Sequence, residues 1–138
     1  VPFEMNALSA HRTPREVEEF ARTASERGLK VIIAGAGMAA ALPGVIAAAT
    51  IVPVIGVPIK GMLDGLDALF SINQMPPGIP VATVGVNGAL NAAILAVEML
   101  ALSDKNIAEK VMAYKEGLKD KIVKANEELA AITYDYKC

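Results

Sequence analysis

The sequence predicts a single α/β domain built around a parallel β-sheet. Three short apolar runs rich in β-branched residues are each followed by a stretch with helical character: Val31–Ala34, Val54–Val57 and Val81–Val86. Strands that alternate with helices form right-handed βαβ units, which place the strands side by side and parallel. The 138 residues fit one domain and are enough to bury a core.

Charged residues are sparse in the middle of the chain. Between positions 31 and 102 they are only Lys60, Asp64, Asp67 and Glu98. Strands of a parallel sheet are covered on both faces, so they read as nearly continuous apolar runs. Glycine and proline interrupt this stretch too often for a membrane span. We therefore expect a doubly covered sheet together with a subunit interface.

Composition narrows the classes of partner. The net charge of -2 and the pI near 5.4 leave no basic surface for nucleic acid or an anionic membrane, so neither is expected as a partner. The single cysteine, Cys138, cannot form an internal disulfide, which fits a reducing compartment and predicts a cytoplasmic location. The sequence contains no Cys/His cluster of the kind that binds zinc, so no metal site is expected.

The N-terminal stretch predicts a strand, a short connection and a helix. Apolar residues alternate over positions 1–8, which favours a strand with one apolar face. Thr13, Pro14 and Glu16 form a capping-box pattern that predicts a helix from Pro14, with Gly28 as the residue that ends it.

His11 and Arg12 fall in this connection, at the carboxyl end of the expected strand. In open parallel sheets this is where ligands bind. The His11 imidazole can exchange a proton near neutral pH, and the Arg12 guanidinium suits a phosphate or carboxylate group. The pair therefore predicts an active site. The alternative is that His11 merely caps a turn and Arg12 lies in solvent.

A second strand-to-helix connection is rich in small residues, starting with Gly35, Ala36 and Gly37 and ending at Gly44. Such a backbone can approach a ligand closely and offer its amides as donors. It is not a dinucleotide fingerprint, because Ala40 replaces the third glycine and no acidic residue follows about 20 positions on. The alternative reason for the small residues is tight packing.

The C-terminal part predicts a long amphipathic helix over 104–131, with Ser103 as its cap. Its apolar residues recur at steps of three and four, and lysine and glutamate fill the remaining positions. Such a stripe exceeds what its own domain would cover, so we expect the helix to pack on a neighbouring subunit. The alternative is a helix that folds back on the sheet.

Six motifs, in order between positions 9 and 84, resemble the PurE family: Ser9–Pro14, Ala34–Gly37 with Leu42–Gly44, Pro53–Pro58, Gly65–Asp67, Gln74–Pro76 and Gly78–Val84. The resemblance implies one PurE-like domain over 1–138 with a flavodoxin-like three-layer sandwich. It also implies a cytoplasmic homo-octamer in which the C-terminal helix, 104–131, embraces neighbouring subunits and the active sites lie at subunit junctions.

The resemblance also implies an enzyme of purine biosynthesis. Members of the PurE family are mutases that move a carboxylate from the exocyclic nitrogen of 5-(carboxyamino)imidazole ribonucleotide to ring carbon 4, with no cofactor and no metal. By this resemblance His11 is the catalytic proton shuttle. The residues implied to bind the small-molecule ribonucleotide are Ser9, Ala10, Arg12, Gly35, Ala36, Gly37 and Leu42.

The chain departs from the family pattern in two ways. It begins at what would be the family's second strand, without the first strand, the Gly-Ser-x-Ser-Asp loop and the first helix. Ala41 stands where the family usually has histidine, and Met38 replaces a glycine. Two other functions remain open: a carboxylase that uses free CO2 and the unsubstituted aminoimidazole, and a non-catalytic relative that binds nucleotides.

Overall fold

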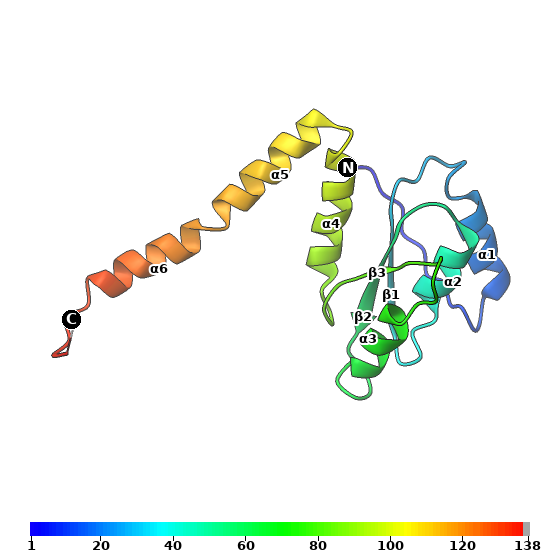
Figure 1. The fold of residues 1–138 in the computed structure, drawn as a ribbon, viewed down its shortest axis with the longest axis horizontal. Helices are drawn as coiled ribbons and strands as arrows, with labels where there is room; N and C mark the ends of the chain where they lie inside the picture. The colour runs from blue at the N-terminus through cyan, green and yellow to red at the C-terminus, as the bar shows by residue number, and fades with distance from the viewer. Residues whose placement is uncertain (137–138) are drawn as a thin grey trace. The chain divides into compact units, whose positions relative to one another are not determined.

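A computed structural model describes residues 1–136 and divides the chain into two compact units, one over 1–99 and one from Leu100 onward. Figure 1 shows the elements in chain order: α1 (Pro14–Thr23), β1 (Ile32–Gly37), α2 (Leu42–Ala49), β2 (Val54–Ile59), α3 (Leu66–Asn73), β3 (Ala82–Thr83), α4 (Ala89–Ala101), α5 (Lys105–Gly117) and α6 (Asp120–Ala130).

The sheet of the first unit is parallel, with the strand order β1-β2-β3. Along its whole length β1 pairs with β2, from Ile32 opposite Val54 to Gly37 opposite Ile59. Helix α2 connects β1 to β2, and helix α3 connects β2 to β3. The predicted βαβ units and the parallel sheet are therefore confirmed.

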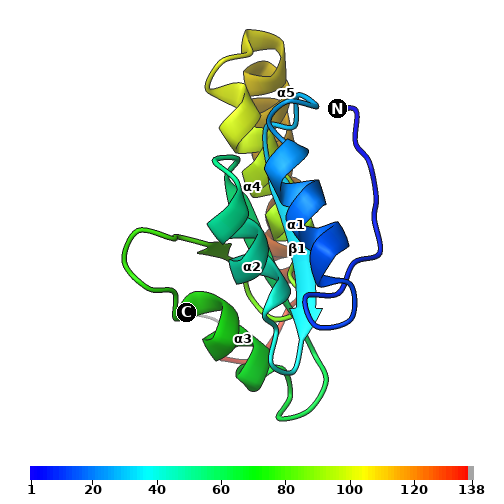
Figure 2. The same ribbon diagram turned by 90° about the vertical axis from the view of Figure 1, so that its right-hand side faces the viewer.

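Helices cover both faces of this sheet, which makes three layers. On one face, Ile32, Ala34 and Val54 pack against buried residues of α1 and α2, while α3 contributes Ala68 and Ile72 to an adjoining cluster. On the other face, Ile55 and Val57 pack against Ala92 and the rest of α4. Figure 2 shows α1 and α2 side by side in front of the sheet and α4 behind it. The predicted covering of both faces is confirmed.

Strand β3 is shorter than the predicted 81–86, since only Ala82 and Thr83 are assigned to it. The Val84 amide still donates to the carbonyl of Gly56, at 3.2 Å. The next ladder bond would need an amide hydrogen on Pro58, which proline lacks, so the pairing stops there.

The strand predicted over 1–8 is wrong, because residues 1–9 form neither strand nor helix. A strand is stabilised by hydrogen bonds to a neighbour as well as by its alternating side chains. Within the described residues no strand lies beside this segment. Leu8 packs against the core, and Glu4 forms an ion pair with Arg27 at 3.1 Å, but Phe3 and Met5 remain exposed.

The predicted role of Gly28 is confirmed. Helix α1 is assigned to Thr23, and helical turns continue to Gly28, which has a φ of 84°. The Gly28 amide donates to Ser25, and the Leu29 amide donates to Ala24. These two bonds form a Schellman motif, in which glycine takes the left-handed conformation at no steric cost.

In the second unit the helix predicted over 104–131 is divided into α5 and α6, with Leu118 and Lys119 between them. Glycine has the lowest helix propensity after proline, and Gly117 ends α5. The cap is also corrected: Asp104, rather than Ser103, accepts a hydrogen bond from the Ile107 amide at 3.1 Å. None of the helices described is both long and apolar enough to cross a membrane.

Candidate functional site

The parallel sheet brings three connections to one end of the first unit. In both ribbon views the turn before α1, the β1–α2 loop and the β2–α3 loop lie at the lower end, where β1 and β2 finish (Figures 1 and 2). Helices α1, α2 and α3 all begin there. This is the carboxyl edge of the sheet, at which open parallel sheets bind their ligands.

The turn that carries His11 is closed by Ser9 and Thr13. The Thr13 amide donates to the Ser9 carbonyl at 2.8 Å, and the Ser9 amide donates to Thr13 Oγ1 at 2.8 Å. Thr13 Oγ1 also donates to the Ser9 carbonyl at 3.1 Å. The predicted capping box is wrong, because the Thr13 hydroxyl makes these bonds and caps no amide of α1.

His11 and Arg12 are both exposed on this turn, and Ala10 is half-buried. The Arg12 amide donates to Ser9 Oγ at 3.2 Å, and Arg12 Nε approaches the same oxygen at 3.5 Å. Ser9 and Arg12, both predicted to bind substrate, are thus adjacent to each other. An anion at this turn could be bound by the guanidinium and the serine hydroxyl together.

Gly35, Ala36 and Gly37 lie in strand β1, not in the predicted loop, because each pairs with a residue of β2. A Cβ at Gly37 would come within 3.3 Å of the Ile59 carbonyl oxygen, and one at Gly35 within 3.5 Å of the Ile59 side chain. The two glycines therefore also serve the packing of β1 on β2. Leu42 is the first residue of α2 and packs against the core.

The loop proper, residues 38–41, is strained and braced from α3. Met38 and Ala40 have φ values of 54° and 42°, a left-handed conformation that residues with a Cβ rarely adopt. Ser71 donates a hydrogen bond to the carbonyl of Ala39, and Ala40 packs on Ala68 and Ile72. Strain of this kind is concentrated at functional sites, where the surrounding structure maintains it.

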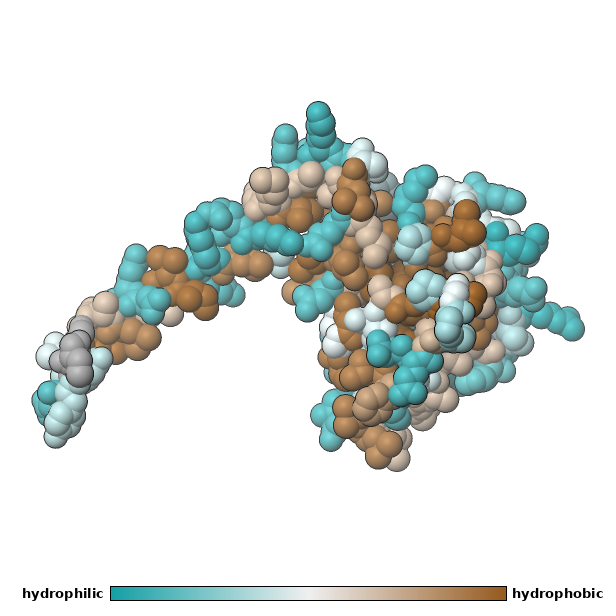
Figure 3. All heavy atoms as spheres, viewed as in Figure 1, coloured by the Kyte–Doolittle hydropathy of each residue, from teal (hydrophilic) through white to brown (hydrophobic). Residues whose placement is uncertain are grey.

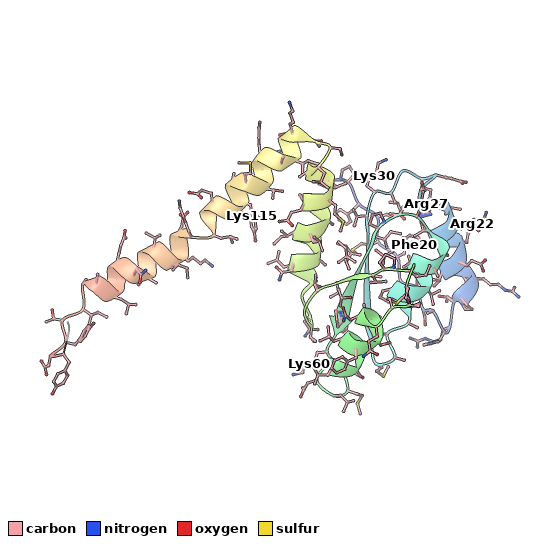
Figure 4. The ribbon with its side chains drawn as sticks, viewed as in Figure 1. Phe20, Arg22, Arg27, Lys30, Lys60 and Lys115 are labelled. Carbon is pink, nitrogen blue, oxygen red and sulfur yellow. The ribbon has the colours of Figure 1, made fainter. Side chains whose placement is uncertain are left out.

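Three charged side chains at the same edge were missed by the sequence reasoning. Lys60 forms an ion pair with Asp64 at 3.1 Å, and its amide donates to Asn87 Oδ1 at 2.9 Å. Asp67 has one carboxylate oxygen that is buried and has no partner. Figure 4 shows Lys60 at the lower end of the unit. The available signal was that Lys60, Asp64 and Asp67 are isolated charges in an apolar stretch.

Other charged groups lie along α1 and the turn that follows it. The Arg27 guanidinium lies over the Phe20 ring, 4.9 Å from its centroid. Figure 4 labels both residues. The hydrogen bond from Arg22 to the Glu19 carboxylate raises the pKa of the Arg22 guanidinium above its ordinary value. These contacts are held by α1 and its flanks, and the carboxyl-edge loops take no part in them.

The fold and this edge define an open-sheet α/β protein with its candidate site at the ends of parallel strands. A family model described as AIR carboxylase matches residues 1–121, and the chain belongs to that family, the PurE family that its motifs resemble.

Individual relatives agree with this assignment. A Pyrococcus abyssi protein named N5-carboxyaminoimidazole ribonucleotide mutase is 62% identical over 120 residues, which cover 86% of this chain and 69% of the relative. A Thermotoga maritima protein of the same name is 52% identical over 135 residues, or 97% and 79% of the two chains. The crystal structure of Treponema denticola PurE matches with a TM-score of 0.75 and 31% identity, covering 88% of this chain and 76% of that one. This similarity agrees with the flavodoxin-like class expected from the motifs.

Proposed function

We propose that this protein is an N5-carboxyaminoimidazole ribonucleotide mutase of purine biosynthesis. The observation that carries the proposal is the 62% identity to a relative of that name over most of the chain. The turn with His11 and Arg12, at the carboxyl edge of the sheet, supplies groups suited to the reaction. We further propose a cytoplasmic location, which the single cysteine in the sequence supports.

The reaction needs little beyond a proton carrier and a closed site. The bond between the exocyclic nitrogen and the carboxylate breaks, which releases CO2 and leaves the aminoimidazole. Ring carbon 4 then forms a new bond to the same CO2. In the balance of the reaction, the nitrogen gains one proton and carbon 4 loses one. A single imidazole that gives and takes a proton therefore returns to its starting state after each turnover.

In this proposal His11 is that imidazole. Arg12 binds the ribonucleotide phosphate with Ser9, because guanidinium and hydroxyl groups both donate hydrogen bonds to phosphate oxygens, and Ala10 is a further substrate-binding residue of the same turn. The backbone of Gly35, Ala36 and Gly37, with Leu42, encloses the base and the CO2. Excluding water there keeps the CO2 next to carbon 4 until the new bond forms.

The second candidate is a carboxylase that takes free CO2, the activity named in the description of the matching family model, AIR carboxylase. Assaying the purified protein with each substrate separates the two. We expect turnover of N5-carboxyaminoimidazole ribonucleotide without ATP or bicarbonate. Turnover of the aminoimidazole ribonucleotide with bicarbonate, and none of the carboxyamino compound, would contradict the proposal.

A homo-oligomer is the second part of the proposal, with the octamer implied by the resemblance as the specific form. Neither α5 nor α6 contains a buried residue. Figure 3 shows apolar side chains between polar ones along both helices. The large apolar side chains exposed there include Met112, Leu118, Ile122, Val123 and Leu129. A neighbouring subunit packed on them would remove this apolar surface from water.

Light scattering tests the oligomer directly. We expect a mass of several times the 14.4 kDa of one chain, and eight times that mass for the octamer. The double variant Leu118→Glu, Ile122→Glu should shift the population toward smaller species, because it places two charges in the interface. Lys121→Gln, in the same exposed helix, is the matched control and should leave the mass unchanged. A monomeric parent protein in dilute buffer would rule the proposal out.

A further inference from the structure

We propose that Thr13 is a positioning residue, whose side-chain hydroxyl fixes the turn that carries His11. The inference rests on the proposed function, in which His11 moves the proton, and it assigns Thr13 a task in the same site. Thr13 does not touch the reacting atoms in this proposal. It acts through the backbone of residues 9–13.

The contacts of Thr13 and Ser9 form a closed unit. Thr13 Oγ1 accepts from the Ser9 amide at 2.8 Å and donates to the Ser9 carbonyl at 3.1 Å. The amide of Thr13 donates to the same carbonyl at 2.8 Å. Both backbone polar groups of Ser9 are therefore bonded to Thr13. His11 lies at the middle of the segment, two residues from each end.

The position of His11 depends on this unit through the backbone of the turn. In the part of the chain that the structure describes, the imidazole is exposed and forms no hydrogen bond or ion pair. Its place is therefore set by the backbone of the turn. One side of the turn is joined to α1, where the Val17 amide donates to the Thr13 carbonyl at 3.1 Å. The Thr13 hydroxyl bonds the other end of the turn, the backbone of Ser9, to Thr13 as well.

The side chain of Thr13 would be expected to cap α1 at this N-terminal position, but it does not. The usual reason for threonine there is thus absent. The Thr13 hydroxyl bonds to Ser9 instead of capping α1, which indicates that the shape of the turn is important for the position of His11. A catalytic group has to be held within a fraction of an ångström of its productive position. Small changes in the backbone of the turn should therefore lower kcat.

The test compares three variants by steady-state kinetics. Thr13→Val keeps the shape of the side chain and removes the hydroxyl, and Thr13→Ser keeps the hydroxyl. Thr23→Val is the matched control, because Thr23 Oγ1 also donates to the carbonyl four residues earlier, Glu19, at 2.8 Å, but on α1 away from the turn. Circular dichroism at the assay temperature verifies that each variant is folded.

We expect Thr13→Val to lower kcat by about tenfold, with KM changed by less than about twofold, because proton transfer is impaired more than binding. Thr13→Ser and Thr23→Val should stay within about twofold of the parent kcat. A folded Thr13→Val protein with the parent kcat would overturn the proposal. So would a Thr13→Ser protein as slow as Thr13→Val.

A spectroscopic measurement separates this inference from the proposed function. His11 is the only histidine in the chain, so 13C labelling of histidine gives one Cε1–H signal. We expect the signal to move or broaden in Thr13→Val and to keep its position in Thr13→Ser and Thr23→Val. An inactive parent protein with this pattern would contradict the proposed function and support the role of Thr13. An unchanged signal in Thr13→Val would overturn that role whatever the activity.

Discussion

Replacing His11 with asparagine is expected to lower kcat for the mutase reaction by about 10²–10⁴-fold, the usual contribution of general acid–base catalysis. Asparagine has a similar reach and can form hydrogen bonds, but it cannot accept and return a proton near neutral pH. Because His11 is exposed and lies outside the core, the fold should be unaffected. Steady-state kinetics with N5-carboxyaminoimidazole ribonucleotide measures the loss.

Arg12→Ala is the informative contrast, since Arg12 is the next residue of the same exposed turn. Loss of a phosphate-binding guanidinium should raise KM more than it lowers kcat.

Ligand binding by the His11→Asn protein should stay close to that of the parent, as isothermal titration calorimetry can establish. A parent-like kcat in His11→Asn would exclude this imidazole as the proton shuttle.

Gly56→Ala is expected to destabilise the protein by about 1–3 kcal/mol, the usual cost of adding atoms to a close-packed core. Gly56 is buried in β2, and a Cβ there would lie 2.3 Å from Ile72 Cγ2 and 3.1 Å from Val81 Cγ1. The Ile72 side chain, and α3 with it, must shift to make room. Thermal unfolding at a fixed protein concentration measures the effect, because oligomerisation makes the midpoint depend on concentration.

The matched control is Gly85→Ala. A Cβ at Gly85 would meet no atom within 4 Å, so the change in stability should stay within about 0.5 kcal/mol. Equal midpoints for Gly56→Ala and the parent would show that the contact between α3 and β2 is loose. Because Ile72 also packs on Ala40, a shift of α3 should in addition disturb the β1–α2 loop and reduce activity.

The sheet could be predicted because its strands carry a strong local signal. The runs that begin at Val31 and Val54 are apolar and bounded by glycine or proline, and each overlaps the first residues of its strand, β1 or β2. The strand expected at the N-terminus failed because alternation describes side chains and does not supply a hydrogen-bonding neighbour. The prediction of a single C-terminal helix was wrong at Gly117, where the low helix propensity of glycine ends α5 although the apolar stripe continues.

The candidate site was only partly accessible to the same reasoning. The turn at His11 was found because histidine, arginine and a helix start are adjacent in sequence. The hydrogen bonds that hold the loops at this edge were not predicted, because Ser71 meets Ala39 and Asn87 meets Lys60 only after the chain has folded. Their sequence separations of 32 and 27 residues leave no local pattern. The bonds of Thr13 were missed for another reason, since a capping pattern and a turn closure use the same residue types.

The left-handed residues of the β1–α2 loop restrict how this region can evolve. Glycine at position 38 or 40 would adopt the observed backbone without penalty, whereas valine or isoleucine would meet a steric barrier at either position. Related sequences should therefore rarely have β-branched residues at positions 38 and 40, even if no ligand contacts these positions. Tolerance in this loop is set by backbone geometry, and a survey of random variants for retained folding would show it as a bias toward glycine.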